Sequence, residues 1–286
     1  DSTFKLVDLI AVLDKKKADT SKIYDSKGGV IEYYGRKVRD SKPGGYGKIS
    51  LARGFELSSN TVLVQSVYDS YKNNPKQFVD RINSYGLNKP LGLPIKGEGK
   101  PVIPQPGTNR WSGVALPWMA FGYGLSVTPL QTLTLYNAVA NDGVMVKPIF
   151  VSEIKEWNKT IKKYNTEVIN PKICSQETLD KVQAVLENVV KRGTGSKLYS
   201  KDFSMAGKTG TAQVNYKDKS KLYYASSFVG YFPADEPKYS CIVVVHKPNV
   251  AAGYYGADVA GPVFKRIAQK IFTDSPSTNH VKNIDA

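Results

Sequence analysis

The apolar residues of this chain change their spacing near residue 204, and this change constrains the fold more than any other feature of the sequence. Upstream of it, apolar side chains recur at helical spacing. Downstream, the alternation typical of strands runs through Ser204–Val214, Ser226–Phe232 and Tyr239–His246, and Val259–Phe272 then returns to a helical pattern. Helices, then antiparallel strands, then a helix predict an α/β fold of the α+β type, with a mostly antiparallel central sheet covered by helices.

Several helices are expected before the strands. The apolar period predicts a helix from about Ser2, two helices within Ile49–Tyr71 broken at Ser58–Asn60, and helices over Pro75–Tyr85, Thr128–Asn141 and Ser175–Gly193. Loops with short strands are expected over residues 25–48, a long irregular segment over the proline-rich and glycine-rich residues 90–117, and strands between residues 144 and 168. With no internal repeat and no strong boundary, we expect one domain over residues 1–272 and a polar tail over residues 273–286.

The charge balance limits the classes of partner. Forty Lys and Arg against 25 Asp and Glu give 40 − 25 = +15, which favours polyanions such as nucleic acid, anionic lipid or an acidic polymer. The basic residues are scattered, however, and no nucleic-acid-recognition motif accompanies them, so we expect no nucleic-acid partner. A hydrophobic content of 41% and a charged content of 23% exclude the disordered class.

Cysteine and histidine residues are few. Cys174 and Cys241 lie far apart in the sequence, and Cys241 belongs to an apolar strand, so no disulfide is expected between them. His246 and His280 form no close ligand pair with either cysteine, so we expect no metal and no cofactor. A Ser-His-Asp arrangement would depend on His246 alone, and a nucleophilic serine in this chain is therefore expected to use lysine as its base.

Ser2 and Lys5 are the first candidates for such a pair. Three residues apart on a helix, they share a face, so the Lys5 amine can reach the Ser2 hydroxyl once burial or a neighbouring cation lowers the lysine pKa. The simpler interpretation is a helix-capping serine followed by a surface lysine.

Two further segments carry polar groups suited to chemistry. Ser58-Ser59-Asn60 places a hydroxyl and a carboxamide in the turn between two helices, although it could equally be a helix-capping cluster. Lys208-Thr209-Gly210-Thr211 places an ammonium and two hydroxyls on a strand whose glycines allow close backbone approach, so that it could pair with an extended peptide and hold a carboxylate.

A phosphate-binding loop is the rival interpretation of Gly207-Lys208-Thr209. That motif requires a glycine five positions before Gly207, where Asp202 stands, and a helix afterwards, where the pattern indicates a strand. The rival interpretation therefore fails on both counts.

Together, Ser2-x-x-Lys5, Ser58-x-Asn60 and Lys208-Thr209-Gly210 resemble, in type and order, the motifs of the active-site serine penicillin-recognising enzymes. The middle motif, Ser-Ser-Asn, resembles that of class B penicillin-binding proteins, and the cell-division type more than the elongation type. The segment Phe121–Gln131 also agrees with this family. The resemblance extends from Ser2 to about Phe272, and it implies a penicillin-binding transpeptidase fold with an all-helical subregion.

The resemblance implies a role for each motif residue. Ser2 would attack the carbonyl between the last two D-alanines of a peptidoglycan stem peptide, Lys5 would take its proton, and Ser58 with Lys208 would pass a proton to the leaving amine. The implied substrate-binding residues are Asn60, Thr209, Gly210 and Thr211. The implied oxyanion hole is formed by the backbone N–H groups of Ser2 and Thr211.

The resemblance also implies partners and a location. The partners would be stem peptides, β-lactam antibiotics and, for the full-length protein, division-complex proteins and a lipid-linked glycan polymerase. The location would be the bacterial cytoplasmic membrane, with the catalytic domain on its periplasmic or outer face. Family members carry a membrane anchor, a pedestal and more of the catalytic domain before the nucleophile, so the chain is expected to be a fragment that lacks these parts and a sheet edge.

Two alternative functions fit the same motifs. A serine β-lactamase would need a group that activates a deacylating water, and neither the Glu-x-x-Leu-Asn element of class A nor the Tyr-Gly-Asn element of class D is present. A β-lactam sensor or a non-catalytic penicillin-binding scaffold would keep the fold and could keep all three motifs. Covalent labelling of Ser2 separates the scaffold from the enzyme.

Overall fold

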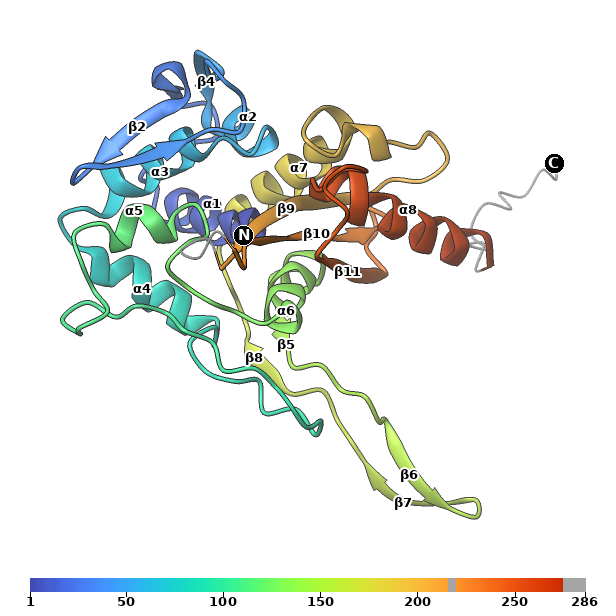
Figure 1. Cartoon of the computed structure of the whole chain (residues 1–286). Helices are drawn as coiled ribbons and strands as arrows, with labels where there is room; N and C mark the ends of the chain where they lie inside the picture. The colour runs from blue at the N-terminus through green and yellow to red at the C-terminus, as the bar shows by residue number, and fades with distance from the viewer. Residues whose placement is uncertain (216–219, 275–286) are drawn as a thin grey trace.

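The computed structural model describes residues 1–215 and 220–274. At its centre is an antiparallel sheet in the order β11-β10-β9, formed by β9 (Ala206–Val214), β10 (Tyr223–Phe232) and β11 (Tyr239–His246). These are the three strands that the two-residue alternation predicted, with β10 beginning three residues earlier than expected. The predicted α/β fold with a mostly antiparallel sheet is therefore confirmed (Figure 1).

Alternate side chains of β10 enter two different cores. Val229 and Tyr231 belong to the larger core, together with side chains of α1 (Lys5–Asp14) and α6 (Pro129–Ala140). Phe228 and Phe232 instead pack against Phe264 of α8 (Gly256–Asp274). The sheet is thus a middle layer between α8 and the other helices, because successive side chains of a strand point to opposite faces.

Helix α1 is buried on every side, whereas its sequence pattern predicted only one apolar stripe. It follows the short 3-10 helix η1 (Ser2–Phe4), and every residue from Lys5 to Leu13 is buried. It packs against α3 (Asn60–Tyr71), α4 (Pro75–Ser84) and α7 (Gln176–Arg192), as expected of a helix that is apolar nearly all round. This central position fixes the Ser2 end of the helix beside β9.

The other predicted helices are present close to their expected bounds. Helix α2 (Leu51–Glu56) and α3 are separated at the expected polar turn, Thr128 forms a capping box with Gln131 at the start of α6, and Ser175 caps α7. The irregular segment expected over residues 90–117 ends earlier than predicted, because α5 (Ala115–Met119) begins within it. Its Pro117 lies in the first turn, where a missing backbone N–H is tolerated.

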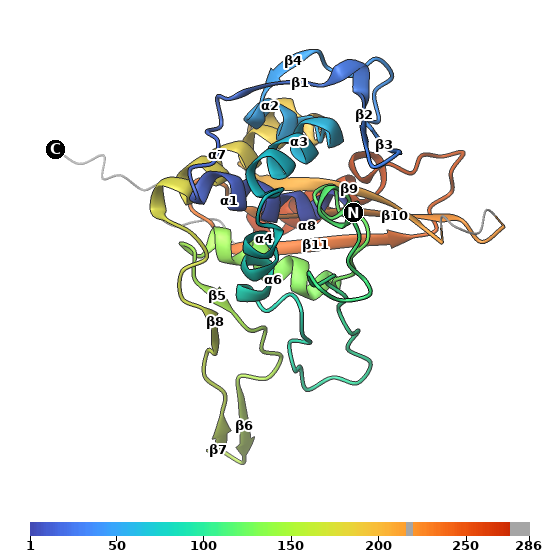
Figure 2. The same ribbon diagram turned by 90° about the vertical axis from the view of Figure 1, so that its left-hand side faces the viewer.

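Short strands and turns complete the fold. They are the pairs β1 (Ile23–Asp25) with β4 (Lys48–Ser50), β2 (Val30–Tyr33) with β3 (Arg36–Arg39), β5 (Met145–Val146) with β8 (Val168–Asn170), and β6 (Glu153–Glu156) with β7 (Lys159–Lys163), and the 3-10 helices η2 (Lys27–Gly29) and η3 (Ser196–Leu198). The β6–β7 hairpin projects far from the body in both views (Figures 1 and 2).

The end of helix α8 lies slightly beyond its predicted position. Helix α8 continues to Asp274 instead of stopping at residue 272, and the rest of the expected tail, with His280, falls outside the described residues. Within the described ranges, no helix is both long and apolar enough to cross a bilayer. Cys174 and Cys241 are both free thiols.

Candidate active site

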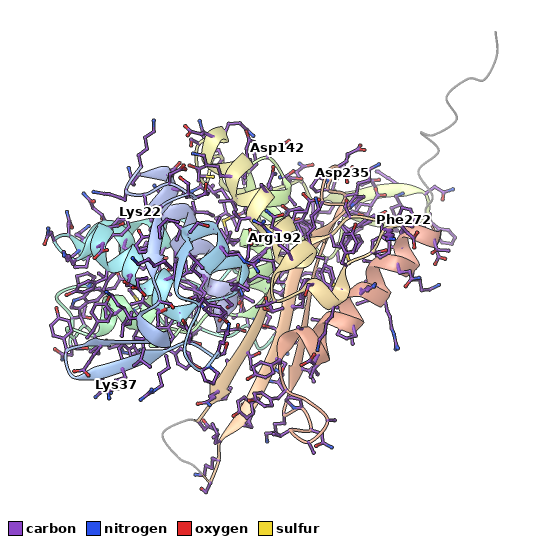
Figure 3. The ribbon with its side chains drawn as sticks, turned by 90° about the horizontal axis from the view of Figure 1, so that it is seen from above. Lys22, Lys37, Asp142, Arg192, Asp235 and Phe272 are labelled. Carbon is purple, nitrogen blue, oxygen red and sulfur yellow. The ribbon has the colours of Figure 1, made fainter. Side chains whose placement is uncertain are left out.

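The three sequence motifs meet at one cavity of about 660 Å³. Its lining comes from η1, the α2–α3 turn, β3, β9 and the segment before α8. Residues of all three motifs take part, namely Ser2, Ser58, Asn60, Thr209 and Thr211. Lys37 of β3 contributes to one rim of the cavity, at the outer edge of the β2–β3 hairpin (Figure 3).

Ser2 is held in place at the start of η1. It is partly exposed, and its neighbour Thr3 is buried, with the Thr3 carbonyl accepting a 2.8 Å hydrogen bond from the Tyr136 hydroxyl. Because η1 contacts β9 directly, Ser2 lines the same cavity as Thr209 and Thr211.

The Lys5 ammonium is fully buried and reaches the α2–α3 turn. It donates hydrogen bonds to the Ser58 carbonyl at 2.8 Å, Ser58 Oγ at 3.1 Å and Asn60 Oδ1 at 2.6 Å. Burial lowers the Lys5 pKa to about 8, although Asp40 and Asp8 oppose the shift. Its three donors thus go to Ser58 and Asn60, whereas helical spacing predicted a contact with Ser2.

The three residues of the α2–α3 turn, Ser58, Ser59 and Asn60, are each held in position by a different local feature. Ser58 adopts a left-handed backbone conformation with φ 57°, and Ser59 caps α3, its hydroxyl accepting from Val62 N–H. Asn60 begins α3, and its Nδ2 donates a 2.6 Å hydrogen bond to the Arg39 carbonyl. The capping interpretation therefore holds for Ser59, while Ser58 and Asn60 face Lys5.

Lys208 of β9 also reaches Ser58. Its ammonium, also fully buried, donates to Ser58 Oγ at 2.9 Å and to the Thr209 carbonyl at 3.0 Å. Burial, together with the charge of Lys5, holds the Lys208 pKa well below its usual range. Two lysines distant in the sequence thus share one hydroxyl acceptor, and an uncharged amine at either position can accept a proton through it.

The strand after Lys208 forms one wall of the cavity. Thr209 Oγ1 lies 2.7 Å from Thr194 Oγ1, and Thr211 Oγ1 accepts from the Gly256 N–H at 3.0 Å. A Cβ atom on Gly210 would clash with the Asp1 carboxylate and with Ser227 Oγ, so a larger residue here would have to displace both side chains. This wall presents threonine hydroxyls and strand backbone to the cavity.

Some residues of the site carried no motif in the sequence. Asp40 accepts from Ser59 Oγ at 3.1 Å and from the Thr61 N–H at 2.9 Å, which fixes the start of α3. Asp8 lies one turn beyond Lys5 on the same face of α1. In the sequence, only this three-residue spacing from Lys5 could have indicated that Asp8 lies near the site. No group of three or more His, Cys, Asp or Glu side chains able to hold a metal ion occurs within residues 1–215 and 220–274.

The chain is similar to known proteins in both sequence and structure. Residues 1–269 match the family model described as "Penicillin binding protein transpeptidase domain". Stage V sporulation protein D of Bacillus subtilis is 30% identical over 273 residues, which is 93% of this chain and 41% of that protein. Peptidoglycan D,D-transpeptidase FtsI of Escherichia coli K12 is 31% identical over 191 residues, 66% of this chain and 30% of that protein. The chain thus spans about two fifths or less of the length of these two relatives.

Two solved structures of penicillin-binding protein 3 from Mycobacterium tuberculosis superpose over almost the whole chain. The complex with aztreonam has a TM-score of 0.82 at 26% identity, covering 96% of this chain and 62% of that one. The complex with ampicillin has a TM-score of 0.82 at 27% identity, covering 96% and 61%.

Proposed function

Because this chain belongs to the family of penicillin-binding protein transpeptidase domains, we propose that it catalyses the cross-linking of peptidoglycan stem peptides through an acyl-enzyme on Ser2. The family predicted from the three motifs is confirmed, and the relatives are class B penicillin-binding proteins. The observation that carries the proposal is the convergence of Lys5 and Lys208 on Ser58 Oγ, at 3.1 and 2.9 Å, beside the cavity that contains Ser2.

In the first half-reaction, Ser2 Oγ attacks the carbonyl carbon between the two terminal D-alanines. The C–N bond breaks, the acyl group stays on Ser2 as an ester, and the last D-alanine leaves as the amine. The Ser2 proton passes to Lys5, whose pKa of about 8 leaves a useful neutral fraction near neutral pH. Ser58, which contacts both lysines, passes a proton to the leaving amine together with Lys208.

The substrate is oriented by the two walls of the cavity. Thr209 and Thr211 hold the terminal carboxylate of the donor, and Gly210 allows its backbone to approach the strand. Asn60 binds the peptide side of the donor from the opposite wall. The backbone N–H groups of Ser2 and Thr211 stabilise the oxyanion, an interaction worth about 3–4 kcal/mol of barrier per donor in other enzymes.

In the second half-reaction, an amine of a second stem peptide attacks the Ser2 ester and forms the cross-link. β-Lactams imitate the D-Ala-D-Ala end, so ring opening by Ser2 would leave an ester that hydrolyses slowly. The similarity of this chain to penicillin-binding protein 3 of M. tuberculosis, which was solved in complex with aztreonam and with ampicillin, supports the proposed reaction with β-lactams.

The setting of the reaction is also a proposal. A transpeptidase acts where its polymer is built, so we place this domain on the outer face of the bacterial cytoplasmic membrane. Division-complex proteins and a lipid-linked glycan polymerase would be partners of the longer protein. The similarity to FtsI of E. coli favours the division role.

Mass spectrometry with benzylpenicillin tests the proposal. We expect a long-lived covalent adduct on Ser2, and no adduct in Ser2→Ala or Lys5→Ala, because the two residues act as one unit. Ser21→Ala and Lys16→Ala, which change exposed residues outside the cavity, serve as matched controls and should label normally. Absence of an adduct in the unchanged chain would indicate a scaffold, and rapid loss of the adduct would indicate a β-lactamase.

A further inference from the structure

The β6–β7 hairpin and the segments that lead into and out of it, residues 147–168, form an arm that extends from the body (Figures 1 and 2). In both views it points away from the β2–β3 hairpin, whose strand β3 contributes Lys37 and Arg39 to the rim of the Ser2 cavity. Strand β5 at the base of the arm packs on α6, whereas β6 and β7 contact chiefly each other, and a two-stranded hairpin alone is marginally stable in water.

Apolar side chains are concentrated on this arm. Eighteen large apolar side chains are exposed in the described part of the chain, and seven of them lie within these residues, namely Ile149, Phe150, Val151, Ile154, Trp157, Ile161 and Val168. Trp157, at the apex, is 95% exposed and has a positive φ of 53°. A bulky residue is unusual at such a position, where glycine or asparagine would be unstrained. So dense an exposed apolar set indicates a binding surface.

The arm is also basic. It carries five lysines and three glutamates, 5 − 3 = +2, and Lys147 and Lys155 are paired with Glu167 and Glu153. Within the described ranges no carboxylate forms an ion pair with Lys159, Lys162 or Lys163. Glu156 lies directly across the β6–β7 ladder from Lys159, and the Lys162 ammonium lies over the Tyr164 ring. The arm therefore presents a net charge of +2 beside its exposed indole and aliphatic groups.

The lysines of the arm also argue against a strand of another protein as the binding partner of this surface. Lysines lie along both strands, and the β6–β7 ladder has a bulge between Ile154 and Lys155. Charged side chains and bulges are the devices that keep exposed strands from pairing edge to edge. An indole at a tip flanked by lysines is instead typical of groups that enter the interface of an anionic bilayer.

We propose that this arm binds the surface of a membrane rich in anionic phospholipid, with Trp157 inserted at the headgroup level. The arm would then set the domain against the bilayer with the rim formed by Lys37 and Arg39 on the far side, facing away from the lipid. This inference depends on the arm alone and does not require the proposed transpeptidase activity.

The test uses vesicles of equal parts phosphatidylglycerol and phosphatidylcholine, compared with phosphatidylcholine alone, at physiological salt. We expect the chain to sediment with the anionic vesicles and its tryptophan emission to shift to shorter wavelength. Trp157→Ser should abolish the shift, since Trp111 and Trp118 are partly buried in the protein, and should weaken binding about tenfold. Val250→Ser, which removes another exposed apolar side chain, is the matched control and should bind normally.

A charge-matched pair of variants distinguishes vesicle binding by the arm from vesicle binding caused by the overall charge of +15. Replacing Lys159, Lys162 and Lys163 by Gln should lower binding about tenfold or more, whereas replacing the exposed Lys15, Lys16 and Lys17 by Gln should change it less than twofold. Equal losses in the two variants would overturn the proposal, as would an emission spectrum unchanged by vesicles. Self-association that Trp157→Ser abolishes would instead identify the arm as an interface between copies. Benzylpenicillin labelling of each variant checks the catalytic proposal separately.

Discussion

The Oδ1 atom of Asn60 accepts a hydrogen bond of 2.6 Å from the buried ammonium of Lys5. The orientation of the amide is fixed, because Nδ2 of the same side chain donates to the Arg39 carbonyl at 2.6 Å. The lysine is therefore held by a neutral acceptor, which positions the amine without supplying a negative charge. This arrangement is compatible with a Lys5 pKa lowered to about 8 by burial.

Replacing that neutral acceptor by a charged one should slow acylation near neutral pH. In Asn60→Asp, the carboxylate favours the ammonium form and raises the Lys5 pKa by about 1–3 units. Only the neutral amine accepts the Ser2 proton, so the rise of the acylation rate with pH, expected near pH 8 in the unchanged chain, should move to higher pH. Penicillin acylation rates measured between pH 6 and 10 give this profile.

The control is Asn83→Asp, because the Asn83 side chain bonds the Gln105 side chain and does not line the cavity. Its pH profile should coincide with that of the unchanged chain. A profile for Asn60→Asp that also coincides would contradict the assignment of Lys5 as the base.

Removing the hydroxyl shared by the two lysines should impair chemistry far more than folding. Ser58→Ala keeps the Cβ atom and the strained φ of 57°, but deprives Lys5 and Lys208 of their common acceptor. We expect acylation to slow by about 10²–10⁴-fold, the usual contribution of a proton-transfer group. Stopped-flow acylation together with thermal unfolding measures both effects.

Ser59→Ala is the matched control for this experiment. Ser59 caps α3 and bonds Asp40, so its loss should cost about 1 kcal/mol of stability while acylation changes only a few-fold. The reverse pattern, with Ser59 essential for acylation and Ser58 important only for stability, would contradict the proposed proton route.

The sequence was sufficient to predict the elements and motifs of this site, because both depend on local patterns. Alternation predicted β9 and β10, and the resemblance of the three motifs to a known family, not the Ser2–Lys5 spacing alone, singled out Ser2 and Lys5. The contact between Lys5 and Asn60 could not be predicted, because it joins residues 55 apart through tertiary packing. Asp8 was missed for a related reason: in an amphipathic helix an aspartate is expected on the solvent side, but α1 has no solvent side.

Glu56 connects the stability of the domain to the position of Thr209. Its carboxylate is fully buried and paired with Arg53 at 2.9 Å and Arg192 at 2.8 Å. Its carbonyl accepts from Thr194 N–H at 3.0 Å, and Thr194 in turn contacts Thr209. Glu56→Gln should lower the free energy of unfolding by about 1–3 kcal/mol, because both arginines lose a charged partner but can still reach solvent. Urea unfolding measures this loss.

An exposed glutamate provides the comparison for Glu56. Glu177 pairs with Lys181 on the surface of α7, so Glu177→Gln should leave the unfolding midpoint nearly unchanged. Equal effects of the two substitutions would mean that burial adds nothing to the Glu56 interaction.

Asp8 should make the protein less stable as pH rises. Its carboxyl is fully buried, and neither oxygen has a hydrogen-bond partner among the described residues. Burial raises the Asp8 pKa well above its usual value, although Lys5 and the amino group of Asp1 act in the opposite direction. Between the unfolded and folded pKa values the folded chain binds more protons, so the free energy of unfolding falls with increasing pH across that interval. Asp8→Asn removes this dependence and should stabilise the chain at neutral pH by about 1–3 kcal/mol.

Asp14, on the same helix, should behave in the opposite way. Burial acts to raise its pKa, but hydrogen bonds from the Ser175 backbone and from Arg81 outweigh burial and lower it. An aspartate with a lowered pKa contributes stability above its unfolded pKa, and that stability is lost on acidification. Asp14→Asn should therefore destabilise the chain at neutral pH, with the difference from the unchanged chain shrinking in acid. Thermal midpoints of both variants from pH 4 to pH 8 give the two signs. If Asp8→Asn also destabilises at neutral pH, the Asp8 carboxylate is ionised there and stabilised by Lys5, and the same variant should then shift penicillin acylation to lower pH.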